Sequence, residues 1–183
     1  MNIDLRPEDC AVLLIDWQVR LAGAMPEAIS ARNQKNVANI LTLAGRLGLP
    51  VVVTEQYPQG LGSTVEPLTG LFEGPAHPKT IFSAMADPAA AAAIKATGRR
   101  SWIVLGIETH VCVFQTVRDM VAAGLEAHVP LDAVLSRSKA NWRNGLELVR
   151  AAGGCITNTE TVLFDLLGEA KGDDFKVISR LIR

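Results

Sequence analysis

This 183-residue sequence has no long apolar run, few cysteines and almost no excess of charge of either sign. Its apolar runs fall far short of the roughly 20 residues that a transmembrane helix needs, so we expect no membrane span. The formal net charge is −1 and no basic block stands out. Proteins that hold nucleic acid or a membrane surface by electrostatic attraction normally carry such a block, so neither partner is expected.

Only three cysteines are present, and Cys10, Cys112 and Cys155 are widely spaced. This number and spacing suit neither a disulfide framework nor a zinc motif and are typical of a reducing compartment. The N-terminus is polar and acidic, unlike a secretory signal. We therefore expect a cytoplasmic protein, and the length predicts a single domain over residues 1–183 with a substantial core.

Short apolar runs alternate with segments of helical periodicity. Strands or extended segments are predicted at 11–15, 51–54, 78–85, 102–105, 126–130 and 155–157, and helices at 30–47, 88–97, about 113–123, 139–152, 159–167 and 174–182. Ser30 is the predicted N-cap of the first helix. Residues 58–77, rich in Gly, Pro, Thr and Ser, predict a long ordered loop. This alternation predicts a three-layer, Rossmann-like α/β fold whose mainly parallel sheet has helices on both faces.

Residues whose side chains could take part in catalysis follow the predicted strands. Asp16 comes directly after the first strand, and Cys112 lies where the strand at 102–105 gives way to a helix. Ligands of open α/β sheets bind beyond the carboxyl ends of the strands, so Asp16 and Cys112 are plausible neighbours. A thiol near a helix N-terminus is favoured in its thiolate form.

A cysteine nucleophile needs a proton acceptor, a cation beside the thiolate and donors for a developing oxyanion. Asp16 suits the first role, Lys79 suits the second, and backbone N–H groups of the turn before Cys112 suit the third. Each residue also has an ordinary alternative. In these alternatives Cys112 is a small residue packed in the core, with about even odds. Asp16 forms a turn at the end of the strand, and Lys79 is a solvated surface lysine.

Several motifs together resemble one family. They are DWQ at Asp16, the Lys79 that precedes FSAM, GIETHVCV after SWIVL, VTEQYPQGLGSTVEPL and the tail FKVISRLIR. In this order they resemble the isochorismatase-like cysteine hydrolase superfamily, and most closely the isochorismatase domain-containing proteins and their bacterial relatives. The resemblance covers nearly the whole chain.

The resemblance implies a roughly six-stranded parallel sheet and a catalytic triad of Cys112, Asp16 and Lys79. It also implies a non-proline cis peptide at Ile107–Glu108, which aims the amides of Glu108 and Cys112 at the oxyanion. The reaction that it implies is hydrolysis of a small amide, ureido or related C–N bond through a thioester. With Lys79 beside it, the Cys112 thiolate is expected to react well below pH 8.5, the unperturbed cysteine value.

Two departures from relatives in the superfamily bear on the substrate. Nicotinamidases carry an Asp and two His after the second strand that bind a metal, whereas this chain has Glu55 there and no histidine before His77. We therefore expect a metal-independent enzyme without a cofactor. The siderophore-pathway isochorismatases, which cleave a vinyl ether, lack the cysteine that this chain has at position 112.

The substrate and the oligomeric state stay open. The residues expected to line the pocket are Trp17, Gln56, Tyr57, Phe82 and Thr109, with core packing as the alternative for the aromatic ones. The family implies a homo-oligomer whose neighbouring subunit can complete the pocket. The alternative functions are hydrolysis of a small ester or vinyl ether, and a non-catalytic scaffold or protein-binding domain.

Overall fold

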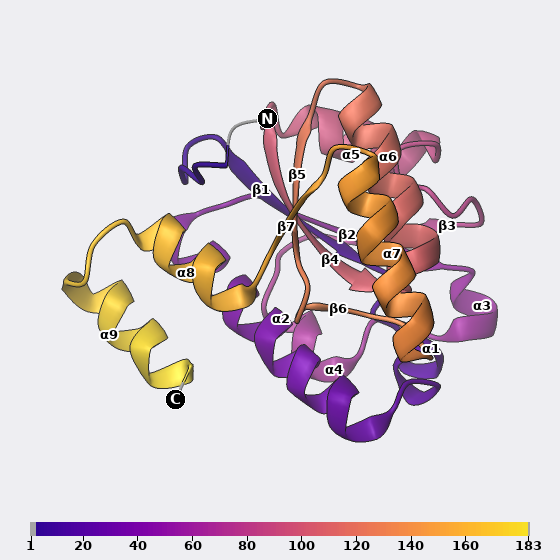
Figure 1. Ribbon diagram of the computed structural model, residues 1–183, viewed down its shortest axis with the longest axis horizontal. Coiled ribbons are helices and arrows are strands. Elements are labelled where there is room, and N and C mark those ends of the chain that lie inside the picture. Colours follow the sequence, from indigo (N-terminus) through magenta and orange to yellow (C-terminus); the bar gives the residue numbers. More distant parts are fainter. Residues whose placement is uncertain (1–2, 183) are drawn as a thin grey trace.

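One open parallel sheet organises the computed structural model, which describes residues 3–182 (Figure 1). Within that range the sheet has seven strands, in the order β3-β2-β1-β4-β5-β7, and β6 pairs with the end of β4. The strands are β1 (Cys10–Ile15), β2 (Val51–Gln56), β3 (Ala76–Lys79), β4 (Ser101–Ile107), β5 (Glu126–Pro130), β6 (Val134–Leu135) and β7 (Cys155–Thr157). All the pairings are parallel, as expected when helical crossovers join successive strands.

Helices cover both faces of this sheet. They are α1 (Val19–Gly23), α2 (Glu27–Leu47), α3 (Pro58–Leu61), α4 (Glu66–Thr69), α5 (Pro88–Ala96), the π-helical turn η1 (Thr109–Val113), α6 (Phe114–Ala122), α7 (Lys139–Ala151), α8 (Thr159–Leu167) and α9 (Gly172–Leu181). Figure 1 shows α2, α8 and α9 on one side of the sheet and α5, α6 and α7 on the other. The predicted three-layer α/β fold is confirmed.

The two faces build two separate hydrophobic clusters because successive strand residues point in opposite directions. Along β1, Val12 and Leu14 belong to the cluster under α2 and α8, whereas Leu13 and Ile15 belong to the cluster under α5, α6 and α7. Every residue of β1 and β4 is buried. A strand buried on both faces appears in the sequence as a continuous apolar run, which is why these strands were predictable.

Two local predictions need correction. Helix α2 begins at Glu27 after Pro26, so Ser30 lies buried inside the helix and is not its N-cap. Residues 58–77 contain the short helices α3 and α4 besides loop segments. The sheet, expected to have roughly six strands, has those six and one more, the two-residue strand β6, which is too short to leave a periodic pattern.

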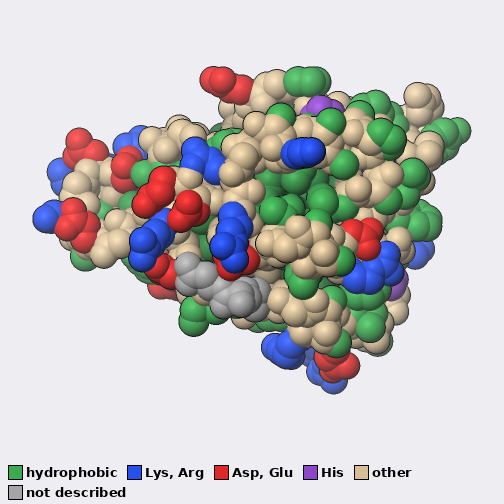
Figure 2. Space-filling model, turned by 90° about the horizontal axis from the view of Figure 1, so that it is seen from above, with side chains coloured by type: hydrophobic (Ala, Val, Ile, Leu, Met, Phe, Trp, Pro, Cys, Tyr) green, Lys and Arg blue, Asp and Glu red, His purple; other side chains and the backbone are tan. Residues whose placement is uncertain are grey.

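Charged side chains of both signs crowd the end of the molecule formed by α8 and α9 (Figure 2). Two ion pairs there join Arg46 to Asp174 and Lys176 to Asp173. No helix in residues 3–182 combines the length and the apolar character needed to cross a bilayer.

The carboxyl ends of β1 and β4 come together at Gly106, whose φ is +139°. A Cβ placed there would meet the carbonyl oxygen of Ile15 and lie 2.7 Å from its Cβ. We expect Gly106→Ala to lower the free energy of unfolding by roughly 2–5 kcal/mol, through backbone strain and overpacking. Urea denaturation measures this. Gly45→Ala is the control, because a Cβ on Gly45 in the interior of α2 meets nothing within 4 Å. The control should be neutral or stabilising, and equal stability of Gly106→Ala and the native chain would contradict the expected clash.

Candidate active site

Three strand ends bring the predicted catalytic side chains to one edge of the sheet. Asp16 follows β1, Lys79 ends β3, and Cys112 lies in η1 directly after β4. Their exposed fractions are 0%, 3% and 6%. A buried acid and a buried lysine are rare unless they are paired, and here they are paired with each other.

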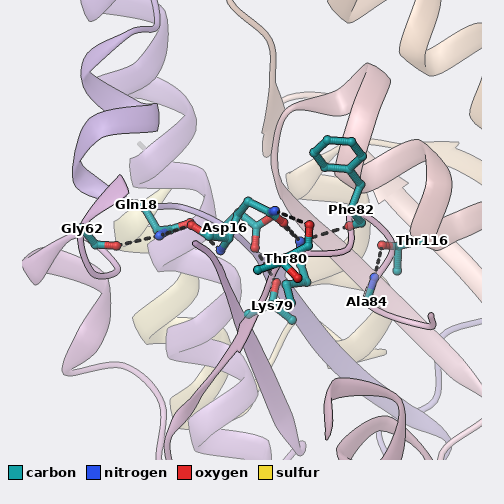
Figure 3. A network of polar contacts seen from close by, with 10 residues as sticks. Asp16, Gln18, Gly62, Lys79, Thr80, Phe82, Ala84 and Thr116 are labelled. Atoms are coloured by element: carbon teal, nitrogen blue, oxygen red, sulfur yellow. Dashed lines mark hydrogen bonds and ion pairs between the residues drawn. The ribbon is translucent and has the colours of Figure 1, made fainter. Parts of the chain in front are cut away.

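Asp16 and Lys79 form the centre of a buried polar network (Figure 3). Lys79 Nζ donates to Asp16 Oδ2 at 2.7 Å, to Gln56 Oε1 at 2.7 Å and to the Phe82 carbonyl at 3.0 Å. These three acceptors match the three protons of the ammonium group. Asp16 Oδ1 accepts a hydrogen bond from Thr54 Oγ1 at 2.7 Å. Both oxygens of Asp16 and all protons of Lys79 are thus held in place.

Gln18 fixes the segment that carries Gln56. Its Oε1 accepts from the Gln56 N–H at 2.8 Å, and its Nε2 donates to the carbonyls of Gln56 and Gly62 (Figure 3). Gln56 in turn donates from Nε2 to the Thr80 carbonyl at 2.8 Å. This side-chain bonding ties the end of β2 to the chain on both sides of it and so positions the acceptor of Lys79.

Cys112 completes the group, and its electrostatic environment opposes ionisation. Burial raises the pKa of its thiol to about 12, helped by the Asp16 carboxylate and by a hydrogen bond with that side chain, while Lys79 lowers the pKa less strongly. The expectation of a free thiolate is therefore wrong for the unliganded protein. The reason is that desolvation and the nearby carboxylate outweigh the ammonium group. Both members of the Asp16–Lys79 pair thus act on the pKa of this thiol, in opposite directions.

Alkylation of Cys112 by iodoacetamide should report this raised pKa. Only the thiolate reacts, so the rate is expected to keep rising with pH up to about 12, where the thiol titrates. Peptide mass spectrometry separates adducts on the three cysteines, and the Cys112→Ala protein confirms the assignment. A rate that levels off below pH 8.5, the unperturbed cysteine value, would contradict the raised pKa.

The turn between β4 and Cys112 is anchored from outside the strand. The Ile107–Glu108 peptide bond is cis. The Glu108 carboxylate accepts from the Arg137 N–H at 3.0 Å and from Arg137 Nε at 3.1 and 3.2 Å. His110 Nδ1 lies 3.1 Å from Ser136 Oγ. Within residues 3–182, no hydrogen bond that leaves a helix or strand has the Glu108 or Cys112 N–H as its donor. The role of these two amides as oxyanion donors stays a prediction.

The expected pocket residues divide into two groups. The first group lies beside Lys79 or near the surface. The Gln56 side chain and the Phe82 carbonyl both accept a hydrogen bond from Lys79. Tyr57 and Phe82 are 54% and 49% exposed. Trp17 and Thr109 are both fully buried. Trp17 lies in the hydrophobic cluster under α2 and α8, which favours its packing alternative. Their substrate contacts stay predictions.

Sequence reasoning missed three residues that hold the site together: Thr54, Gln18 and Arg137. Thr54 belongs to a buried strand, where a threonine passes for a packing residue. Gln18 follows Asp16 within the DWQ motif, and this position was the available signal for it. Arg137 lies 29 residues from Glu108, a separation that no local pattern connects.

The part of the chain that the structure describes contains no evident metal-binding site. No group of three or more His, Cys, Asp or Glu side chains there is arranged to hold an ion. The metal-free reaction stays a prediction, which metal analysis of the purified protein tests.

Fold and site together define a class: a Rossmann-like α/β protein with a buried cysteine beside an acid–lysine pair at the carboxyl edge of its sheet. The model of the isochorismatase domain matches residues 10–161. The chain therefore belongs to the isochorismatase family.

Individual relatives agree with this assignment. Isochorismatase domain-containing protein 1 of Danio rerio is 41% identical over 137 residues, which are 75% of this chain and 48% of that protein. This chain thus spans about half the length of that relative. The MAR1 ribonuclease structure from Caenorhabditis elegans is 32% identical with a TM-score of 0.89, over 98% of this chain and 92% of that one. The Escherichia coli YcaC protein, an octameric hydrolase of unknown specificity, is 23% identical with a TM-score of 0.91, over 99% and 91% of the two chains.

Proposed function

We propose that this protein is a metal-independent cysteine hydrolase that cleaves a small amide, ureido or related C–N bond through a thioester on Cys112. The observation that carries this proposal is that a buried thiol, Cys112, lies at the same edge of the sheet as the buried Asp16–Lys79 ion pair. Both charges of the pair act on the pKa of the thiol. A buried thiol that served packing alone would have no need of an ion pair beside it, because burying charge is costly.

In the proposed first step, Asp16 removes the proton from Cys112 as the sulfur attacks the acyl carbon. Because the pKa of the thiol is raised to about 12, deprotonation is coupled to attack rather than completed before it. Lys79 stays charged and stabilises the negative charge that develops on the sulfur. The N–H groups of Glu108 and Cys112 donate to the oxyanion.

In the second step the C–N bond breaks, and Asp16 returns its proton to the departing amine. This leaves the acyl group on sulfur as a thioester. A water molecule then attacks the thioester carbon, giving its proton to Asp16 and its hydroxyl to the acyl group. Cleavage of the C–S bond releases the carboxylic acid, and the proton passes back to restore the Cys112 thiol.

A screen of small amides and ureas, read as ammonia release, tests the proposed reaction. The expected result is release by the native protein on at least one member of the set and none by Cys112→Ala protein on the same compound. Equal release by both proteins would contradict the proposal. Parallel assays with small esters and vinyl ethers test the alternative hydrolases, and inactivity on all three substrate types would favour the scaffold alternative.

Hydrolysis of RNA is a competing hypothesis because of the name of the Caenorhabditis elegans neighbour. Cleavage of a phosphodiester needs cationic donors aimed at the phosphate, whereas all three protons of Lys79 bind acceptors within the protein. We therefore favour the C–N bond. Cys112-dependent degradation of a single-stranded RNA would reverse that preference.

We also propose that the chain forms a homo-oligomer. The segments that flank the Asp16–Lys79 network expose four large apolar residues: Val19, Tyr57, Ile81 and Phe82. Contact with another subunit would cover them. The octameric state named for YcaC is a precedent at the level of the fold. Light scattering of the purified protein tests this, and a monomer would contradict it.

A further inference from the structure

Helix α7 lies against the turn that carries Cys112, and Gly145 is the point of closest approach between them. Gly145 is buried in the interior of α7 and has an ordinary helical backbone, although such a position favours alanine over glycine. A Cβ on Gly145 would lie 2.7 Å from the Thr109 carbonyl carbon and from the His110 nitrogen, and 2.9 Å from the His110 Cα. The missing side chain therefore makes room for the backbone of η1.

A side chain at this position would have to displace backbone, which cannot turn aside as the flexible end of a side chain can. The turn η1 is π-helical, a form that is rare and frequent at functional sites. Cys112 lies two residues after His110 in this turn, whereas Asp16 and Lys79 come from other strands. A shift of η1 away from α7 would therefore move the sulfur relative to an ion pair that stays in place.

The segment between β6 and α7 holds the same turn from a second side. Figure 1 shows β6 leading into α7. Ser136 is only 2% exposed, and its Oγ lies 3.1 Å from His110 Nδ1. Arg137 binds the Glu108 carboxylate through both its backbone N–H and its side chain. One continuous stretch of chain thus contacts the turn at several residues just before Cys112, as a nucleophile held in a fixed geometry requires.

We propose that Gly145 and Ser136 are positioning residues for Cys112. Together they fix the place of the sulfur relative to the Asp16–Lys79 pair, and neither touches the reacting atoms. Gly145 acts on the backbone of the turn through its lack of a side chain, and Ser136 acts through its contact with the His110 ring. The effect on turnover rests on the proposed function, but alkylation of the thiol reports its position without any substrate.

Gly145→Ala protein is expected to hydrolyse a confirmed amide with a kcat roughly tenfold to a hundredfold lower and with little change in KM, because a small misplacement of a reacting group costs that much. Alkylation of Cys112 by iodoacetamide at pH 8 should become about tenfold faster. Relief of the clash separates η1 from α7 and lets water reach the thiol, and burial is the largest cause of its raised pKa. A slower enzyme with a more reactive thiol is the signature of misplacement.

Gly154→Ala is the matched control for overpacking. A Cβ there would lie 2.8 Å from the Cγ1 atoms of Val117 and Val149, so its nearest contacts are with these side chains and not with η1. Urea denaturation measures how far each variant is destabilised. The control should keep the native kcat and the native rate of Cys112 alkylation. Native rates in Gly145→Ala protein, or the same changes in both variants, would overturn the proposal.

Ser136→Ala adds no atom, so it tests the positioning even if Gly145→Ala does not fold. Loss of one hydrogen bond should slow hydrolysis about threefold to tenfold and make alkylation of Cys112 faster. The control is Ser138→Ala, which removes the acceptor of the Asn141 N–H at the start of α7 and should leave both rates unchanged. Native rates in Ser136→Ala protein would overturn its role. If the native protein hydrolyses no amide, the proposed function fails, and the alkylation rates still decide the positioning.

Discussion

Cys112→Ala protein is expected to lose at least roughly a thousandfold in the rate of hydrolysis of a confirmed substrate, because the nucleophile is absent. The fold should persist, since the substitution removes one sulfur atom from a side chain that contributes little besides packing. We expect a change in the free energy of unfolding of about 1 kcal/mol. The ammonia-release rate and urea denaturation of the same preparation measure the two quantities.

Cys155→Ala is the matched control for that loss. Cys155 is half-buried, and the raised pKa of its thiol comes from burial, with no ionisable neighbour among its causes. This variant should keep the native rate. A Cys112→Ala protein that stayed active, or a Cys155→Ala protein that did not, would show that the wrong thiol has been assigned.

Lys79→Met is expected to lower the free energy of unfolding by roughly 3–5 kcal/mol, because it leaves a buried charge without its partner. Asp16 Oδ2, Gln56 Oε1 and the Phe82 carbonyl all lose the same donor. Hydrolysis should be lost as well, since no cation then stabilises the developing thiolate. Denaturation and the ammonia assay on the same variant measure both effects.

A second variant separates stability from catalysis at this pair. Asp16→Leu/Lys79→Met removes both charges, so it should recover part of the stability that Lys79→Met loses and stay inactive. Lys35→Met, at an exposed position of α2, should change stability by no more than about 0.5 kcal/mol. If Lys79→Met were as stable as Lys35→Met, the expected contribution of the ion pair to the free energy of unfolding would be wrong.

The fold was predictable because β1 and β4 are buried on both faces and so appear as unbroken apolar runs. The convergence of Asp16 and Cys112 was predictable for a related reason. Parallel strands end at one edge, so residues that follow β1 and β4 meet there whatever their separation in sequence. Lys79 was a candidate cation from the sequence alone. The family resemblance was needed to prefer it over the ordinary reading as a solvated surface lysine.

Other features arise only from the packed molecule. The pKa of Cys112 depends on how far the thiol is buried and on which of two opposite charges acts more strongly, and neither follows from residue spacing. The contact of Glu108 with Arg137 and the close approach of Gly145 to η1 both join segments that are distant in sequence. Ser30 shows the converse failure, since a good N-cap residue was overridden by a helix that begins earlier, at Glu27.

The most direct measurement of the central claim is the mass of the protein quenched in acid during turnover of an amide substrate. The account predicts a transient species heavier than the free protein by the substrate less its departing amine, with the added group mapped to the peptide that contains Cys112. A protein that stays unmodified throughout turnover, or an adduct on Cys10 or Cys155 in place of Cys112, would contradict it.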